Sequence, residues 1–406
     1  MWSPLQSGDV SALSANLAFG SGILGLFFPL IQGAAVVLVS RSVARDLAEL
    51  VRIWETSGVT RIVLVAPQMR QVLLLGKDVS RRLKKITMIG LSGAVLTPEM
   101  LPAIHELFPQ AKLMNAYSCV EVGTMATLWE TVPGRRDRSL SVGSVLPNMS
   151  VFILGPKLNP LPFGMPGEIY VASSALSRGY LNRPELTRKH FLANPFGGPE
   201  RLYRTGDIGR FLPNGDLQYL GRIDNQVKVR GIRIELEEIE AILQTHGDVQ
   251  QAAVIATPQA GDARLVAFAS AKPGRSLRAA ALRQYLTDRL PGYMVPAMLL
   301  VLESFPTTAN GKIDRQSLPV LADDRRNRDA EYVAPGDPLE SSMAAIWQQE
   351  LGLERVGVAD HFLEAGGDSL IAVKIALRVQ ERFGYELPVG KLFEHPTIRE
   401  LVREIF

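Results

Sequence analysis

Residues 1–135 alternate short apolar runs, rich in β-branched residues, with segments of helical periodicity. The runs are "AAVVLV", "RIVLVA", "KITMIG" and "AKLMNAY", and the helical segments include "VARDLAELVRIWETSG" and "TPEMLPAIHELF". Parallel strands need long crossover connections, usually helices, and they are buried on both faces. The alternation therefore predicts a parallel α/β layer. The most apolar run, residues 23–40, is interrupted by Pro29, Gln32 and Gly33, so it predicts a buried helix followed by a strand, not a membrane span.

The pattern changes three times after residue 135. Residues 140–222 contain short strand-like segments between Pro and Gly turns, which predicts a small antiparallel β-barrel or sandwich. Residues 223–320 have a smaller α+β pattern. Residues 321–335 are charged and lack apolar periodicity, as in a linker, and residues 336–406 have the pattern of a four-helix bundle. The predicted fold class is multidomain α/β plus all-α.

Composition excludes several function classes. The 406 residues carry 44 basic and 41 acidic side chains, and this net charge of +3 gives no nucleic-acid footprint. The single cysteine, Cys119, excludes an internal disulfide framework and a thiolate-rich zinc site, which is typical of a reducing compartment. The first residues have no signal-peptide pattern. We therefore expect a cytoplasmic protein without nucleic-acid or membrane partners.

Seven motifs occur in a fixed order along the chain. They are "NAYSCVE" (115–121), "GEIYVASSALSRGYLNRPELT" (167–187), "YRTGD" (203–207), "GRIDNQVKVRGIRIELEEIE" (221–240), "LPGYMVP" (290–296), "NGKIDR" (310–315) and "HFLEAGGDSL" (361–370). Their order and spacing resemble nonribosomal peptide synthetase adenylation domains followed by a peptidyl carrier domain. The resemblance covers nearly the whole chain. It implies that residues 1–222 are the C-terminal half of an adenylation core, residues 223–320 its C-terminal subdomain, and residues 336–406 a phosphopantetheine-binding carrier domain.

The resemblance implies nucleotide-binding roles for three residues and a metal-binding role for a fourth. Asp207 would hold the ribose hydroxyls of ATP, because an ionised carboxylate is an acceptor-only group that suits a diol. Tyr117 would stack on the adenine, and Arg222 would support the ribose or a phosphate. Glu121 would coordinate the Mg²⁺ that bridges the phosphates. Alternatively, Asp207 is a turn residue and Tyr117 a core residue. Val120 stands where the family has a threonine or serine whose hydroxyl contacts the phosphates.

Three further residues match motif positions in the second half of the chain. Lys312 would be catalytic, placing its charge between the substrate carboxylate and the α-phosphate, although a solvated loop lysine is the alternative. Asp224 matches the hinge, which must move because adenylation and thioester formation use different faces of the small subdomain. Ser369 follows Gly-Gly-Asp at the start of a predicted helix. On these residues alone it is a helix cap. By resemblance it carries 4′-phosphopantetheine through a phosphodiester, and the cap role falls to Asp368.

The substrate pocket that the resemblance implies consists of small or apolar residues. They are Gly20, Ser21, Leu24, Gly90, Ser92, Ala116, Thr124 and Met125. The family places an aspartate at the start of this pocket to pair with the α-ammonium of an amino acid. Here Gly20 and Ser21 occupy the two possible registers. Because a buried, unpaired ammonium is costly, the sequence predicts an acid without an α-ammonium group, such as a fatty, hydroxy or keto acid, or one whose amine lies elsewhere.

The family also has a preceding segment with a phosphate loop ending in lysine, which these 406 residues do not contain. We therefore expect a truncated or split product whose missing half comes from a complementing N-terminal chain. The predicted function is ATP-dependent activation of a carboxylic or amino acid as its acyl-adenylate and thioester loading onto Ser369, with adenylation inactive in this chain alone. The alternative is a non-catalytic carrier protein with an inert adenylation remnant. A stand-alone acyl-CoA ligase is disfavoured by the carrier motif.

The expected cofactors are covalent 4′-phosphopantetheine on Ser369, ATP and Mg²⁺. The expected partners are a phosphopantetheinyl transferase and condensation or other synthetase domains.

Overall fold

The computed structural model describes most of the chain, and its contacts divide the chain into two compact units. The units are Met1–Asp224 and Asn225–Phe406, and each is considered by itself. The described residues are 5–6, 8–40, 43–92, 100–123, 125–131, 141–197, 201–224, 226–229, 232–259, 262–308, 313–319, 332–363, 365–367 and 369–405. No helix among these residues has the length and apolarity that crossing a membrane requires.

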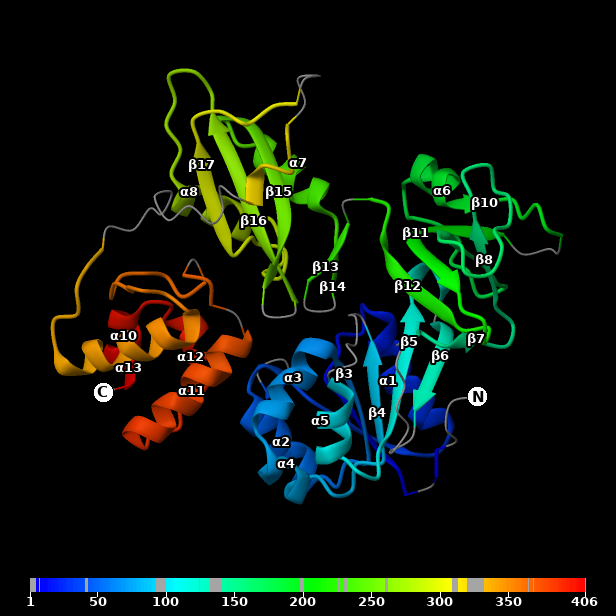
Figure 1. The fold of residues 1–406 in the computed structure, drawn as a ribbon, viewed down its shortest axis with the longest axis horizontal. Coiled ribbons are helices and arrows are strands. Elements are labelled where there is room, and N and C mark those ends of the chain that lie inside the picture. The colour runs from blue at the N-terminus through cyan, green and yellow to red at the C-terminus, as the bar shows by residue number, and fades with distance from the viewer. Residues whose placement is uncertain are drawn as a thin grey trace. The chain divides into compact units, whose positions relative to one another are not determined.

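The first unit contains a mainly parallel sheet with the strand order β2-β1-β3-β4-β5-β6-β7 (Figure 1). The strands are β1 (Val10–Leu13), β2 (Ala35–Leu38), β3 (Arg61–Val65), β4 (Met88–Ser92), β5 (Lys112–Ser118), β6 (Met125–Thr131) and β7 (Ser144–Val145). The first five strands pair in parallel, and β6 and β7 join antiparallel. This confirms the predicted parallel layer. The sequence patterns did not indicate β1 and β6.

Helices cover both faces of this sheet. They are α1 (Gly20–Ile31), η1 (Val43–Arg45), α2 (Leu47–Thr56), α3 (Ala66–Leu74), α4 (Lys77–Arg82) and α5 (Met100–Leu107). The α2 helix begins after Asp46, whose side chain accepts hydrogen bonds from two backbone N–H groups of the first turn. Its apolar residues recur at helical spacing, and Leu50 and Trp54 lie beside Leu64 of β3. Thus α2 lies on the face of the sheet to which Leu64 belongs.

The prediction that the first apolar run forms a buried helix is wrong in one respect. The helix exists as α1, but only Gly22 and Pro29 are buried, while Phe27 is 55% and Ile31 is 74% exposed. The reason is that α1 turns its small residues to the sheet. A Cβ atom at Gly25 would lie 3.0 Å from Cδ1 of Leu13 in β1. This close approach leaves the large apolar side chains on the outer side of the helix.

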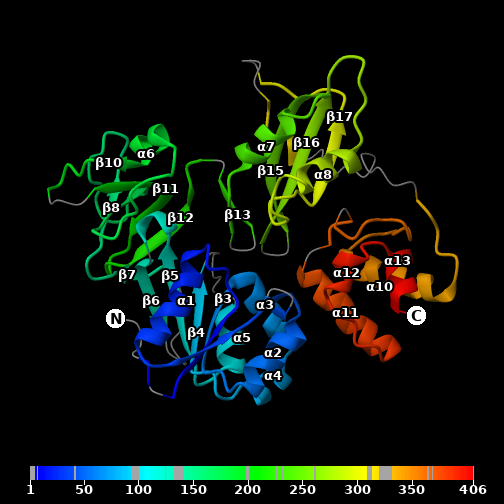
Figure 2. The same cartoon turned by 180° about the vertical axis from the view of Figure 1, so that it is seen from behind.

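The rest of the first unit is an antiparallel region, as predicted (Figure 2). Its strands are β8 (Ser150–Leu154), β9 (Gly167–Ala172), β10 (Phe191–Leu192), β11 (Leu202–Phe211) and β12 (Leu217–Arg222). The helix α6 (Pro184–His190) lies between β9 and β10 in the sequence, and the short helix η2 (Val120–Val122) lies between β5 and β6. Their order is β10-β11-β9-β8, with β12 paired to β11. One hydrophobic cluster joins this sheet to the first, because Tyr117 of β5 packs with Ile169 and Tyr203.

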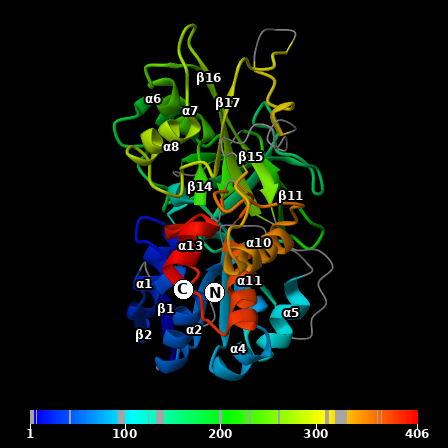
Figure 3. The ribbon, with the colours of Figure 1, turned by 90° about the vertical axis from the view of Figure 1, so that its left-hand side faces the viewer.

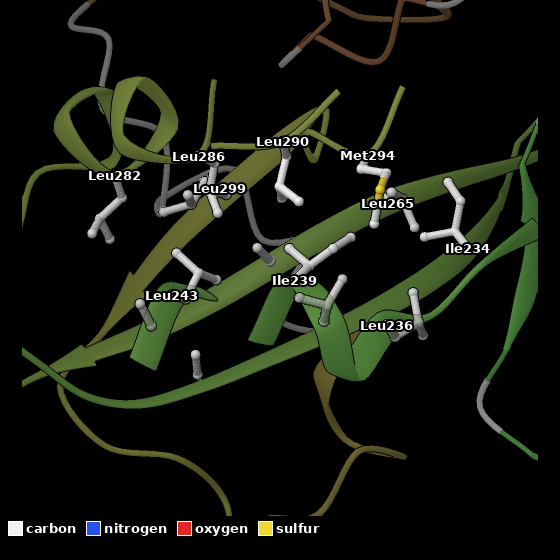
Figure 4. Packing of buried hydrophobic residues seen from close by; sticks show 14 of the residues in the cluster. Ile234, Leu236, Ile239, Leu243, Leu265, Leu282, Leu286, Leu290, Met294 and Leu299 are labelled. Atoms are coloured by element: carbon white, nitrogen blue, oxygen red, sulfur yellow. The ribbon is translucent and has the colours of Figure 1, made fainter. Parts of the chain in front are cut away.

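The second unit begins with the predicted α+β region. It contains β13 (Val227–Val229), β14 (Ile232–Ile234), α7 (Leu236–Gln244), β15 (Val249–Gln259), β16 (Asp262–Ala271), α8 (Ala279–Thr287) and β17 (Met298–Leu302). The β15–β16 pair is antiparallel and the β16–β17 pair is parallel. Leu243 of α7 and Leu286 of α8 belong to one hydrophobic cluster with Leu265 and Leu299 (Figure 4).

The C-terminal part of this unit is helical (Figure 3). Its helices are α10 (Pro338–Leu351), α11 (Ser369–Phe383), α12 (Lys391–Glu394) and α13 (Ile398–Ile405). They share a hydrophobic core around Trp347 and Phe362, whose ring centroids are 5.2 Å apart. The segment "GKLFEHP" contains the short helix α12. The predicted linker, 321–335, lies mostly outside the described residues.

Candidate functional site

Asp207 lies on β11 where this strand departs from its pairing with β9. Its side chain is 6% exposed, and both carboxylate oxygens accept hydrogen bonds. Oδ2 accepts from the Tyr117 hydroxyl at 2.5 Å, and Oδ1 accepts from Nη1 of Arg222 at 2.6 Å. Arg222 stands directly opposite Asp207 in the β11–β12 register. Arg222 therefore gives this buried carboxylate a charge-assisted hydrogen bond.

Arg222 has a second acidic partner. Its Nε and Nη2 donate to Oδ1 and Oδ2 of Asp224, both at 2.6 Å, in a bidentate pair. Nη2 also donates to the backbone carbonyl of Thr205 at 3.1 Å. Arg222 is 7% exposed, whereas Asp224 is 43% exposed. The structure therefore brings Asp207, Arg222 and Asp224 into one ion-pair network.

Tyr117 enters the same network from β5. Its side chain is 3% exposed, and its ring lies 6.4 Å from that of Tyr219. Burial, followed by the negative charge of Asp207, holds the pKa of Tyr117 well above its ordinary value. The neutral phenol therefore remains a donor to Asp207. Stacking of Tyr117 on an adenine stays a prediction.

Glu121 lies in the η2 turn that follows β5. Its Oε1 accepts a hydrogen bond from the Tyr180 hydroxyl at 2.8 Å, and that hydroxyl lies 3.3 Å from the hydroxyl of Tyr203. Tyr180 thus orients the predicted metal-binding carboxylate. In the parts of the chain that the structure describes, no three His, Cys, Asp or Glu residues cluster as a metal site. Mg²⁺ is usually bound through one or two carboxylates plus substrate phosphates, and metal binding by Glu121 stays a prediction.

Two neighbours of Glu121 bear on the site. Val120 is 59% exposed and offers no hydroxyl at a position where the resemblance expects one. Cys119, the residue before the η2 turn, is half-buried and packs against the cluster that contains Tyr117.

Several predicted pocket residues share one face of the parallel sheet. Gly90 of β4 stands between Val63 of β3 and Met114 of β5 in the register. Ala116 lies two residues beyond Met114 and so belongs to the same face. A Cβ atom at Gly90 would lie 3.2 Å from Cγ2 of Val63, so this position has little room for a larger residue.

The α1 helix covers this same face. Ser11 pairs with Arg61, so Leu13 and Val63, each two residues further on, lie on one side of the sheet. Leu13 is the residue that approaches α1, which places Gly20 and Ser21 in the first turn of a helix over this face. That first turn contains no acidic residue, and Phe19 at the N-cap makes no side-chain capping bond.

The remaining pocket residues are placed as follows. Leu24 is half-buried in the second turn of α1, and Met125 begins β6 opposite Ser118. Ser92 ends β4, but its side chain is outside the described part of the structure, as is Thr124 altogether. We call the set Gly20, Ser21, Leu24, Gly90 and Ala116 the small-residue face. It carries no charged side chain.

Ser369 is the first residue of α11, a helix of 15 residues. The chain reaches it through two glycines with different constraints. Gly366 has a φ of +100°, which favours glycine. A Cβ atom at Gly367 would lie 2.3 Å from the ring of Phe362, which is fully buried. Packing against the helical core therefore fixes the turn before Ser369. Lys312 and Asp368 lie outside the described residues.

Three protein families match this chain. The AMP-binding enzyme family matches residues 1–181, its C-terminal domain residues 238–312, and the phosphopantetheine attachment site residues 341–405. Tyrocidine synthase 3 of Brevibacillus parabrevis is 35% identical over 402 residues, covering 99% of this chain. The phosphinothricin tripeptide synthetase PhsC of Streptomyces viridochromogenes is 38% identical over 96% of this chain. The chain belongs to the nonribosomal peptide synthetases. It spans 6% of the length of the first relative and 35% of the second.

Solved structures have the same fold. Holo-PA1221, an NRPS protein containing adenylation and PCP domains, aligns over 99% of this synthetase chain and 67% of its own length, with a TM-score of 0.80 and 24% identity. IdnL1 aligns over 75% of this chain and 63% of its own length, with a TM-score of 0.65 and 28% identity. These alignments confirm the multidomain fold class.

The residues of this synthetase chain fit the groups that its families use. A phosphopantetheine attachment domain carries that group covalently, and adenylating enzymes use ATP and Mg²⁺. Ser369 begins a helix, where free backbone N–H groups and the helix dipole favour an appended phosphate. Asp207 retains lone pairs for a diol, since each carboxylate oxygen can accept two hydrogen bonds.

Sequence reasoning missed three contributors to the adenylation region. Tyr180 orients Glu121, the carbonyl of Thr205 accepts from Arg222, and Gly206 leaves room for this contact. Two features of the sequence indicate parts of this arrangement. The Arg-x-Asp spacing of Arg222 and Asp224 is compatible with an ion pair, and the glycine inside "YRTGD" indicates an irregular backbone.

Proposed function

We propose that this chain supplies adenylation and carrier functions to a synthetase module. A carboxylic acid attacks the α-phosphate of ATP, which gives the acyl-adenylate and releases pyrophosphate. The acyl group then passes to a thiol held on Ser369, and AMP leaves. The observation that carries this proposal is that one chain combines the Asp207–Arg222–Asp224 network with a serine at the start of a carrier helix.

The described residues support specific roles in the first step. Asp207, fixed on both oxygens, would orient the ribose diol, and Arg222 would add positive charge beside it. Glu121, oriented by Tyr180, would hold Mg²⁺. Lys312 would bring its charge to the oxygens that become negative during adenylyl transfer. When attached to Ser369, phosphopantetheine supplies the thiol that accepts the acyl group.

The small-residue face supports a substrate class. An α-amino acid bound there would lose water from its ammonium group without a carboxylate from Gly20 or Ser21 to replace it. We therefore propose an acid that lacks an α-ammonium group, such as a fatty, hydroxy or keto acid.

Partners follow from the carrier domain. A carrier implies a phosphopantetheinyl transferase and other synthetase domains. We propose a condensation domain among the latter. The single cysteine supports a cytoplasmic location.

Val120 favours a second candidate function. Its exposed isopropyl group replaces a hydroxyl next to Glu121. This feature supports a non-catalytic carrier that another enzyme charges on Ser369. Both candidate functions require that serine.

The shared requirement is tested by modifying the chain with a phosphopantetheinyl transferase and coenzyme A and then measuring intact mass. Wild type should gain one phosphopantetheine group, and Ser369→Ala should gain none. Ser341→Ala is the matched control, because Ser341 lies in the first turn of another carrier helix, α10, and is exposed. An unmodified wild type, or a modified Ser369→Ala, contradicts the proposal.

Pyrophosphate exchange separates the two candidates. We expect little exchange from these 406 residues alone, since one preorganised donor contributes about 2.7–4 kcal/mol to transition-state stabilisation and Val120 provides no hydroxyl. If a polypeptide supplying the phosphate loop restores exchange, Lys312→Ala should remove most of it and leave Ser369 modification intact. Failure of every such polypeptide to restore exchange would favour the carrier-only function.

A further inference from the structure

The backbone around Asp207 forms a bulge, in which side-chain hydrogen bonds replace the strand pairing. The β11–β9 register jumps between Arg204 and Ile208, so the residues between them leave the ladder. Side chains replace the lost strand bonds. The Thr205 hydroxyl donates to the carbonyl of Ile169 at 2.7 Å and accepts from the N–H of Asp207 at 3.0 Å. The position of Asp207 therefore depends on this bulge.

Arg222 closes the bulge from the other side. Its Nη2 donates to the Thr205 carbonyl, which would otherwise lose its strand partner. Gly206 has a φ of +74°, and a Cβ atom there would lie 2.6 Å from Nη2 of Arg222 and 2.9 Å from Oδ2 of Asp224. Only a residue without a side chain leaves space for the Arg222–Asp224 pair above the bulge.

Asp224 is thus the residue that fixes the guanidinium. Two of the three guanidinium nitrogens of Arg222 donate to Asp224, and the third donates to Asp207. An arginine side chain has many rotamers, so its hold on Asp207 depends on the restraint that Asp224 provides. Asp224 is also the last residue of the first compact unit.

We propose that Asp224 is a positioning residue for the nucleotide-binding carboxylate. Through Arg222 it holds the 205–207 bulge and Asp207, so the hinge position and the ribose site form one coupled element. This inference rests on the proposed function, because it takes Asp207 as the ribose ligand. Linkage makes the coupling reciprocal: a nucleotide that draws Asp207 or Arg222 toward itself changes the strength of their hold on Asp224 by the same factor.

The coupling is tested first without nucleotide, by hydrogen exchange of the backbone followed by mass spectrometry. In Asp224→Asn, the peptide covering β11 should exchange severalfold faster than in wild type, because the guanidinium loses a charged, bidentate partner. The same increase is expected for Arg222→Lys, since lysine keeps the charge but cannot form the bidentate hydrogen bonds to Asp224. The matched control is Asp216→Asn, which removes a carboxylate bound to Ser141 and Asn214 in the same unit.

The second measurement is AMP binding by calorimetry, on the same full-length variants. Asp224→Asn should weaken AMP by about tenfold, and Asp216→Asn should not. Unchanged β11 exchange in Asp224→Asn overturns the coupling, whatever the nucleotide result. If exchange responds as expected but wild type binds no AMP, the coupling stands and the nucleotide role of Asp207 in the proposed function fails.

Discussion

The ion-pair network of Asp207, Arg222 and Asp224 and the small-residue face lie in the same unit and are built in opposite ways. In the network, Asp207 and Arg222 are buried, Asp224 is exposed, and each charge depends on another. On the small-residue face, Gly20 and Gly90 have no side chain that could carry a charge or a hydrogen bond. The difference predicts that substitutions on the small-residue face leave intact the interactions that stabilise the fold, whereas substitutions in the ion-pair network do not.

The sharpest test of this contrast is Arg222→Ala. It leaves Asp207 and Asp224 without their cation, and breaking a buried ion pair costs about 3–5 kcal/mol. We expect the free energy of unfolding of the first unit to fall by that amount in urea titrations followed by circular dichroism. Ser21→Ala on the small-residue face should stay within about 0.5 kcal/mol of wild type. Equal effects of the two substitutions would break the comparison.

A smaller effect is expected for Gly206→Ala. A φ of +74° is strained for alanine, and the new methyl group would press on Arg222 and Asp224. Holding one residue in such a backbone region costs about 1–3 kcal/mol. The same urea titration measures it, with Gly215→Ala as the control for strain alone, since Gly215 has a φ of +85° but open space around it. A loss no greater than that of Gly215→Ala would show that contact with the ion pair adds nothing.

Gly20→Asp should change substrate choice on the small-residue face. A carboxylate in the first turn of α1 is favoured by the helix dipole and can pair with an α-ammonium. We expect the ratio of pyrophosphate exchange with α-amino acids to exchange with their desamino analogues to rise about tenfold, or roughly 1.4 kcal/mol. The assay uses the complemented enzyme, with Ser21→Asp as the alternative register. No shift in either aspartate variant would mean that the pocket is misplaced.

The smallest effect concerns pH. The pKa of Tyr117 is raised in the folded state. The stability that this shift gives the folded state is therefore fully present below the unfolded tyrosine pKa of about 10, and it is lost as the pH rises further. Between pH 10 and 10.5 the loss is at most about 0.7 kcal/mol. Wild type should therefore lose stability more steeply than Tyr117→Phe over this interval in denaturant titrations. If the stability of both proteins fell equally with pH, burial would not raise the pKa of Tyr117.

The sequence predicted much of the architecture because periodicity and turn residues report local structure. The parallel strands β3, β4 and β5 and the helices α7 and α8 were expected from apolar spacing alone. The missed strand β1 has only four residues, and its central residues read "SA", which gives no β signal. The exposure of α1 was missed because periodicity does not tell which side of an apolar helix is covered.

For the site, sequence motifs named residues but could not give the interactions between them. Asp207 and Arg222 were each assigned to the nucleotide, and Asp224 was assigned to the hinge. Their pairing depends on the β11–β12 register and on the bulge before Ile208. A bulge has no reliable sequence signature beyond a glycine. The hydrogen bond from Tyr117 to Asp207 spans 90 residues and two sheets, so no local pattern could indicate it.

Cys119 has a practical consequence for experiments on motion. It is the only cysteine in the 406 residues, it lies two residues from both Tyr117 and Glu121, and it is half-buried. Once phosphopantetheine is attached, the chain would have two thiols: one fixed at the end of β5 and one on a long flexible arm. Fluorophores coupled to the two thiols would report the distance between the arm and the end of β5 by energy transfer. The labelled arm thiol can no longer accept an acyl group, so the signal would follow motion of the arm and not thioester formation.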